Sequence, residues 1–122
     1  MIFVDTSVWI DHLRSADVKL QALLQNDEIV THLLVRLELA LGSIANRDKV
    51  LADLARLPEV PIAASDELFR LVELRKLSRR GIGITDLHLV ASALIDSSIS
   101  VWTRDRRLGE IANELGVRAA IP

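Results

Sequence analysis

The hydrophobic positions at the start of the chain form one continuous run, from Met1 to Val4, which ends at Asp5. A run without polar alternation is typical of a strand that is covered on both faces, as in a parallel α/β sheet. Thr6 and Ser7 follow as helix-entry residues, and the next hydrophobic positions have helical spacing. The pattern therefore predicts that Asp5 lies where a central strand ends and a helix begins. In open α/β sheets, ligands bind at this edge.

The rest of the chain alternates between helical spacing and short hydrophobic segments. Hydrophobic stripes predict helices over residues 8–13, 20–24, 33–42, 50–57, 65–77, 84–94 and 108–115, and short strands are expected at 28–31, 60–62, 97–102 and 117–121. The helix over 65–77 is expected to place Leu68, Phe69, Val72 and Leu77 on its inner side. Alternating strands and helices predict an α/β fold with a mostly parallel central sheet flanked by helices. Without repeats or a linker, residues 1–122 are expected to form one domain.

Composition narrows the class of protein. The chain has 122 residues, of which 50% are hydrophobic and 26% charged, which is typical of one globular domain with one core. It has no cysteine, which excludes a disulfide, a thiolate zinc site and a cysteine nucleophile. No hydrophobic run approaches membrane-spanning length, and the N-terminus lacks a signal-peptide pattern. The sequence therefore predicts a cytoplasmic protein.

Three further acids stand at informative positions. Glu38 interrupts the hydrophobic stripe of the helix over 33–42, so we expect it on the buried face of that helix. Asp86 opens the helix over 84–94. Asp105 follows the strand over 97–102, just as Asp5 follows the first strand. Because the carboxyl ends of parallel strands share one edge, these four acids are expected to line one cleft there.

Each acid also has a structural interpretation when it is viewed alone. Asp5 and Asp86 stand where a carboxylate commonly caps a helix N-terminus. Glu38 is equally consistent with a boundary residue that reaches solvent or pairs with Arg36 or Arg47. The chemical interpretation therefore depends on whether the four acids come together.

Four carboxylates in one cleft would repel one another without a cation. Mg²⁺ and Mn²⁺ prefer ligand sets made only of oxygen, and such sites activate water in phosphodiester cleavage. The net charge is −2, from 17 acidic and 15 basic residues. If four acids form the site, the rest of the chain has 13 acidic and 15 basic residues. This slightly positive remainder is compatible with a ligand that has a phosphate backbone. The candidates for contacts to that backbone are Arg79, Arg80, Arg104, Arg106 and Arg107, each of which is read equally well as part of a solvated basic surface.

The order of these motifs resembles that of the PIN-domain ribonucleases, and among them the VapC-type toxins of bacterial toxin–antitoxin modules. The resemblance covers the whole chain. It is carried by Asp5-Thr6-Ser7 with Trp9, Glu38-Leu39-Ala40-Leu41-Gly42, Thr85-Asp86-Leu87-His88-Leu89-Val90-Ala91, and Thr103-x-Asp105. Any one of these motifs is weak, whereas the four in this order are fairly specific.

The resemblance implies a PIN-like three-layer fold and a Mg²⁺-dependent (or Mn²⁺-dependent) endoribonuclease. Asp5 and Asp86 would be the principal metal ligands, Glu38 and Asp105 would complete the cluster, and Thr103 would support it by hydrogen bonding. The implied partners are RNA, a cognate antitoxin that covers the cleft, and a second copy of the chain in a homodimer that uses helices away from the cleft.

Two positions depart from the family pattern. Arg107 stands where many relatives carry a second acid, and Leu108 stands where many have Phe. The implied metal site therefore has four acids rather than five, which puts a second metal ion in more doubt than the first.

Two other classes of protein remain as alternatives. A non-catalytic PIN-like scaffold would act only through a partner, and the presence of all four acids argues against it. A Mg²⁺-binding signalling receiver domain normally has adjacent acids after its first strand and a late Lys; here Val4 precedes Asp5 and no Lys follows Lys76. The histidines, His12, His32 and His88, lie in different segments without ligand spacing, which argues against a zinc site or a histidine-based triad.

Overall fold

The central sheet has three short parallel strands in the order β2-β1-β3. The structure is a computed structural model that describes residues 1–121. The strands are β1 (Ile2–Val4), β2 (Ile29–Val30) and β3 (Ser100–Trp102). Phe3 pairs with Val30 on one side and with Val101 on the other. The first hydrophobic run is therefore the central strand, as its sequence predicted.

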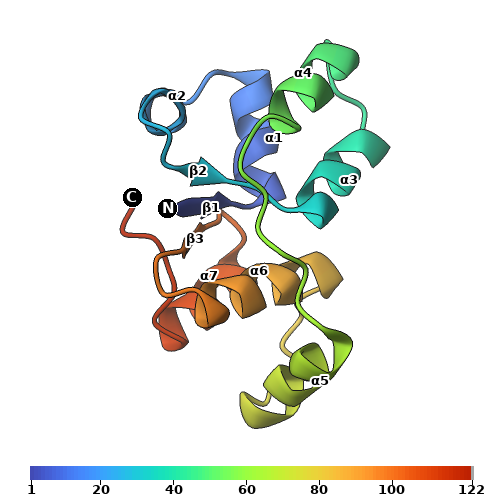
Figure 1. The fold of residues 1–122 in the computed structure, drawn as a ribbon, viewed down its shortest axis with the longest axis vertical. Helices are drawn as coiled ribbons and strands as arrows, with labels where there is room; N and C mark the ends of the chain where they lie inside the picture. The colour runs from blue at the N-terminus through green and yellow to red at the C-terminus, as the bar shows by residue number, and fades with distance from the viewer. Residues whose placement is uncertain (122) are drawn as a thin grey trace.

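Helices cover both faces of this sheet (Figure 1). Helices α1, α3 and α4 lie on one side and α6 and α7 on the other, while α5 packs against α6 at the far end of the molecule. This three-layer α/β arrangement is the one expected for a PIN-like fold. The helix bounds are α1 (Thr6–Arg14), α2 (Val18–Gln25), α3 (Leu33–Leu41), α4 (Arg47–Leu54), α5 (Ser65–Leu74), α6 (Ile84–Ile95) and α7 (Arg106–Glu114).

Burial on both faces explains the unbroken hydrophobic run of β1. Successive strand residues point to opposite faces of a sheet. Phe3 and Val4 are nevertheless both fully buried, and Val101 and Trp102 of β3 are buried in the same way. Because helices cover both faces, these consecutive buried positions all carry hydrophobic side chains. Among residues 1–121, no helix is both long enough and hydrophobic enough to cross a lipid bilayer.

The end of α7 shows how a glycine returns the chain to the sheet. Gly116 has φ +71°, which favours glycine, and Val117 N donates to Ala112 O at 2.9 Å across the turn. The chain then passes beside β3, where Val101 N donates to Val117 O and Ala119 N donates to Val101 O. The strand predicted over 117–121 is thus reduced to one bridge, between Val101 and Arg118.

Several other predicted elements differ from the structure in their presence or bounds. The strand over 60–62 is wrong: the bridge forms one residue earlier, at Glu59 with Thr31, and Pro61 has no N–H with which to continue it. The strand over 97–102 begins only at Ser100, because Asp96 and Ser98 form a turn closed by the Asp96 side chain. The helix over 50–57 is shifted to Arg47–Leu54. The strand over 28–31 is reduced to Ile29–Val30, and the helix over 65–77 ends at Leu74.

The inner side of α5 was predicted incorrectly at one position. Phe69 is 75% exposed, although it was expected to face inward with Leu68 and Val72. It follows Leu68, which is half-buried, by one residue and is therefore turned by about 100° around the helix axis. Leu77, beyond the end of α5, is buried as expected.

Candidate active site

Asp5 lies at the carboxyl end of β1, between the first strand and α1. Its backbone N donates to Trp102 O at 2.9 Å, so Asp5 continues the pairing of β1 with β3. Asp5 occupies the N-cap position of α1, but its side chain makes no capping hydrogen bond. Instead, Asp5 Oδ2 accepts hydrogen bonds from Ser7 Oγ at 2.7 Å and Thr103 Oγ1 at 2.8 Å. The helix-cap interpretation of this buried carboxylate is therefore wrong.

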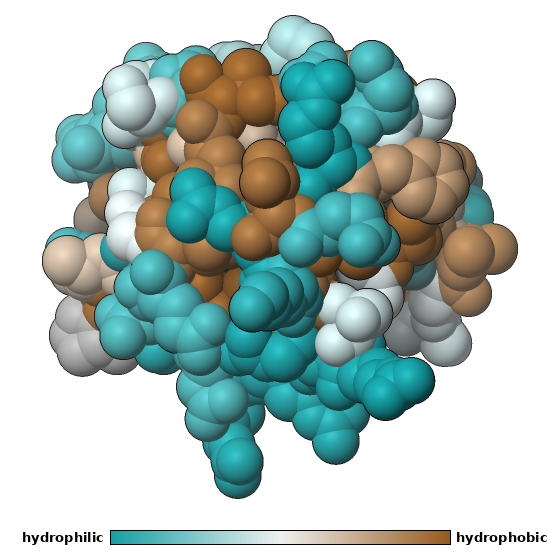
Figure 2. All heavy atoms as spheres, turned by 90° about the horizontal axis from the view of Figure 1, so that it is seen from below, coloured by the Kyte–Doolittle hydropathy of each residue, from teal (hydrophilic) through white to brown (hydrophobic). Residues whose placement is uncertain are grey.

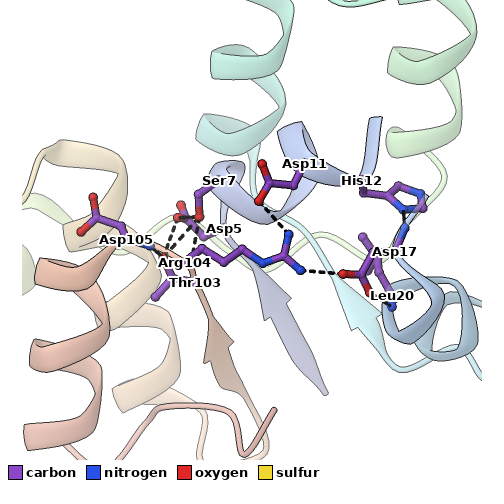
Figure 3. A network of polar contacts seen from close by, with 9 residues as sticks. All are labelled: Asp5, Ser7, Asp11, His12, Asp17, Leu20, Thr103, Arg104 and Asp105. Atoms are coloured by element: carbon purple, nitrogen blue, oxygen red, sulfur yellow. Dashed lines mark hydrogen bonds and ion pairs between the residues drawn. The ribbon is translucent and has the colours of Figure 1, made fainter. Parts of the chain in front are cut away.

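Thr103 connects Asp5 to Asp105. Its Oγ1 donates to Asp5 and accepts from the backbone N of Asp105 at 3.0 Å. Asp105 is the N-cap of α7, and its Oδ1 accepts from Leu108 N at 2.9 Å. Asp105 thus caps α7, and the Thr103 hydroxyl bridges its backbone N–H to the carboxylate of Asp5. Figure 3 shows this group at the ends of β1 and β3.

Glu38 lies on the exposed side of α3, so its predicted place on the buried face is wrong. Val35 and Leu39 form the buried face. The helix carries hydrophobic residues on nearly all sides, which made its inner side ambiguous from spacing alone. Glu38 Oε1 accepts a hydrogen bond from Thr6 Oγ1 at 3.0 Å, which ties α3 to the start of α1.

Neither arginine that the sequence offered as a partner for Glu38 pairs with it. Arg36 forms an ion pair with Glu59 at 2.6 Å. Arg47 donates to Ala40 O at 2.8 Å and lies 4.0 Å from Asp48. The pairing interpretation of Glu38 is therefore wrong, and its contact with α1 stands instead.

Asp86 lies in the first turn of α6, where its Oδ2 accepts from Gly83 N at 3.2 Å. This hydrogen bond confirms that Asp86 caps the N-terminus of α6. Partial burial, followed by the negative charges of Asp5, Asp105 and Glu38, raises the pKa of Asp86 to about 6, although the Gly83 N–H lowers it in part. Asp86 is thus within electrostatic reach of the other three acids.

The four carboxylates share a pattern of hydrogen bonding. Each has one oxygen that accepts from the protein, and each has a second oxygen without a protein donor among residues 1–121: Asp5, Glu38, Asp86 and Asp105. Carboxylate oxygens are the donors that hard divalent cations take, so the donor chemistry fits such an ion. Within the described part of the chain, however, no three acidic or histidine side chains converge closely enough to form a compact metal cluster.

The five arginines that the sequence offered as RNA contacts differ in what they bind in the structure. Arg104 forms ion pairs with both Asp11 and Asp17. Arg80 forms a two-pronged pair with Glu114, and Arg106 pairs with Glu110 one turn along α7. For residues 1–121, no ion pair involves Arg79 or Arg107.

Sequence reasoning missed two hydroxyl groups of the site. Ser7 was taken only as a helix-entry residue, yet its Oγ binds Asp5 and accepts from the backbone N of Arg104 at 3.1 Å. Thr6 was treated in the same way, yet it holds Glu38. The available signal was the spacing: Ser7 follows Asp5 by two residues, and Thr103 precedes Asp105 by two.

Two histidines that seemed unrelated in sequence meet in the core. The ring centroids of His32 and His88 are 5.2 Å apart, and both residues are buried. His32 Nδ1 accepts from Leu34 N and caps α3. Burial lowers the pKa of both, with the neighbouring His88 adding to the effect at His32.

Comparison with known proteins establishes the family. The family model for the PIN domain matches residues 2–114, so the chain belongs to the PIN domain family. It is also similar to two curated relatives, both named Ribonuclease VapC32. They come from Mycobacterium tuberculosis, strains CDC 1551 / Oshkosh and ATCC 25618 / H37Rv, and each is 50% identical over 120 residues, covering 98% of this chain and 97% of the relative. The resemblance to VapC-type PIN ribonucleases is thereby confirmed.

Proposed function

We propose that this chain is a metal-dependent endoribonuclease that acts as the toxin of a toxin–antitoxin module. The observation that carries the proposal is the set of four carboxylates at one sheet edge. In each carboxylate, one oxygen accepts a hydrogen bond from the protein and the other has no protein donor among residues 1–121. The similarity to Ribonuclease VapC32 over nearly the whole chain supports the same activity. Residues 1–122 form the single domain that carries it, and RNA in the cytoplasm is the substrate.

The residues have separate roles in this proposal. Asp5 and Asp86 are the principal ligands for Mg²⁺ or Mn²⁺, while Glu38 and Asp105 complete the cluster and orient the attacking water or a second ion. Thr103 fixes the carboxylate of Asp5 through its hydroxyl. A bound divalent cation lowers the pKa of a water molecule and neutralises charge that develops on the phosphodiester.

The raised pKa of Asp86 supports the cation in particular. Mutual repulsion among the acids contributes to this shift, and a cation bound between them would remove that repulsion. Binding is therefore expected to be coupled to loss of a proton from Asp86 near pH 6.

Basic residues near the site supply contacts to the RNA backbone. Arg79 and Arg107 make no ion pair within residues 1–121 and can turn toward phosphates. Arg80 and Arg106 pair with exposed carboxylates, and such pairs are weak enough to exchange for a phosphate. Arg104, the remaining candidate, is already paired with two carboxylates.

Exposed hydrophobic residues around α5 offer a surface for association with another protein chain. Phe69 and Leu74 on α5, Ile95 on α6 and Ile62 are all more than half exposed. Figure 2 looks onto the end of the molecule where α5 lies and shows hydrophobic atoms gathered on this face. This end supports the proposed homodimer, which leaves the acidic edge open to RNA or to the cognate antitoxin. Light scattering that shows a monomer at micromolar concentration would contradict the dimer.

The proposal is tested by cleavage of a mixed RNA pool in Mg²⁺ and in EDTA. Asp5→Asn keeps the shape of the side chain and its hydroxyl contacts but removes the charge. It is expected to lower cleavage by at least about 100-fold, because a metal-site carboxylate stabilises the reaction by several kcal/mol. Asp66→Asn, an exposed acid in the first turn of α5, is the matched control and is expected to cleave normally. A wild-type protein that binds an antitoxin but never cleaves RNA would instead support the scaffold alternative.

A further inference from the structure

The side chain of Arg104 connects the segment 103–105, which follows β3, to the N-terminal helices α1 and α2. Its Nη1 donates to Asp11 Oδ2 on α1 at 2.8 Å, and its Nη2 donates to Asp17 Oδ2 at the start of α2. Figure 3 shows the side chain reaching from the end of β3 across to both carboxylates. A guanidinium holds its donors in a rigid fork, so two acids on separate elements fix its position better than one would.

The backbone of the same residue reaches the acidic edge. Arg104 N donates to Ser7 Oγ at 3.1 Å, and Ser7 Oγ donates to Asp5 Oδ2 at 2.7 Å. On either side of it, Thr103 Oγ1 donates to Asp5 and Asp105 N donates to Thr103 Oγ1. The residue is thus bonded to the site through its backbone and to α1 and α2 through its side chain.

The anchor at Asp17 is itself firmly held. Asp17 Oδ1 accepts from Leu20 N and caps α2, and its backbone N donates to His12 Nδ1 at 2.9 Å. The Leu20 N–H and the Arg104 guanidinium both lower the pKa of Asp17, so its carboxylate stays charged. The Arg104 guanidinium also lies 5.6 Å from the ring centroid of Trp102, which adds a cation–π contact.

We propose that Arg104 is a positioning residue, which holds Thr103 and Asp105 against Asp5, and is not a contact for RNA phosphate. This rests on the proposed nuclease function and corrects the place of Arg104 among the RNA-binding candidates. Two carboxylates more than neutralise its single charge, so a phosphate would meet net negative charge there. For Arg104 to bind a phosphate, its guanidinium would first have to leave two ion pairs. Arg107 has no ion pair to break within residues 1–121.

The first test is amide hydrogen exchange in the full chain, with Arg104→Ala compared with Arg36→Ala. Arg36 is the matched control, because it is also an ion-paired arginine that links two segments, at a different place. Arg104→Ala is expected to speed exchange at amides 104 and 105 by at least about tenfold, since both donate to hydroxyls whose positions it secures. Arg36→Ala is expected to leave both amides protected.

The second test separates positioning from RNA binding. Arg104→Ala is expected to lower kcat by at least about tenfold through misplacement of the carboxylates, with the RNA Kd and its salt slope nearly unchanged. Arg104→Lys, which keeps the charge and can reach one carboxylate, is expected to restore part of kcat. Combining Arg104→Ala with Asp11→Asn and Asp17→Asn is expected to lower kcat no further than Arg104→Ala alone, because both acids act on the site through their ion pairs with Arg104.

Several results would overturn the proposal. Protected amides at 104 and 105, together with a weaker RNA Kd and a flatter salt slope, would make Arg104 an RNA contact. Additive effects with Asp11→Asn and Asp17→Asn would show that Arg104 does not act through these two acids, which would also contradict the proposal. If Arg104→Ala does not fold, Arg104→Lys and Asp11→Asn carry the same comparison. If the wild type cleaves no RNA, the proposed function fails, while the exchange rates still decide whether Arg104 places this segment.

Discussion

Two polar regions of the molecule differ in how their side chains are satisfied. At the carboxyl edge of the sheet, each of the four acids accepts a hydrogen bond from a hydroxyl or a backbone N–H. In the core where His32 and His88 meet, several buried polar atoms have no hydrogen-bond partner among residues 1–121: Thr31 Oγ1, His32 Nε2, His88 Nδ1 and Ser92 Oγ. The first region holds charge, whereas burial keeps the second neutral.

The comparison shows that charge decides where polar groups must be paired. Neutral imidazole and hydroxyl groups are tolerated in the core without direct partners at a modest cost each, but an unpaired buried carboxylate would cost much more. The pKa shifts follow the same division, since burial raises the pKa of Asp86 and lowers those of His32 and His88. The two regions therefore respond to pH in opposite directions.

The largest effect is expected from His32→Ala. His32 is fully buried, stacks on Phe3 and caps α3. The substitution leaves a cavity and removes the cap, so the free energy of unfolding is expected to fall by about 2–4 kcal/mol in chemical denaturation. A loss below about 0.5 kcal/mol would show that this core is loosely packed and would weaken the comparison.

Asp86→Asn is expected to have the next largest effect on stability, with the opposite sign. The folded-state pKa of Asp86 is raised from 3.8 to about 6, so its contribution to stability is fully present below 3.8 and is lost as pH rises through 6. Asn keeps an acceptor for Gly83 N and carries no charge. In EDTA at pH 7 the variant is expected to be more stable than the wild type by about 2 kcal/mol, with the advantage disappearing near pH 4. Urea titrations at both pH values measure this, and a less stable variant at pH 7 would mean that the charge of Asp86 stabilises the fold.

His88→Leu is expected to have the smallest effect at neutral pH and to reveal the opposite pH dependence. Leu fills a similar volume and removes Nδ1, which has no partner within the described chain, so the variant is expected to be at least as stable as the wild type at pH 7.5, within about 1 kcal/mol. The lowered pKa of His88 means that the stability of the wild type is present above 6.5 and is lost as pH falls. The advantage of the variant is therefore expected to grow toward pH 5. An advantage that shrinks there would contradict the burial of a neutral imidazole.

The sequence predicted the parallel α/β sheet and the edge at which the acids gather, because both depend on local signals. A continuous hydrophobic run that ends in Asp5, and the same arrangement at Asp105, identify strand ends without knowledge of distant residues. What the sequence could not predict depends on contacts between distant segments. The meeting of His32 with His88 and the pairing of Arg104 with Asp17 join residues 56 and 87 positions apart.

The errors in predicting which face of a helix is buried have a different cause. In α3 and α5, hydrophobic residues on several sides of the helix made more than one inner face consistent with the spacing. Glu38 and Phe69 were consequently placed inside, whereas the structure exposes both. The placement of Asp5, Asp86 and Asp105 was unaffected, because it depended on the ends of elements and not on their faces. That all four acids line one cleft stays a prediction.

The central claim is that the four carboxylates hold a divalent cation, and the most direct measurement is the melting temperature with and without Mg²⁺. In millimolar Mg²⁺ the wild type is expected to melt about 5 °C or more above its value in EDTA, because binding to the folded state stabilises it. Asp86→Asn, although more stable in EDTA, is expected to gain much less from Mg²⁺. Equal gains in both proteins would place the ion elsewhere and contradict the account.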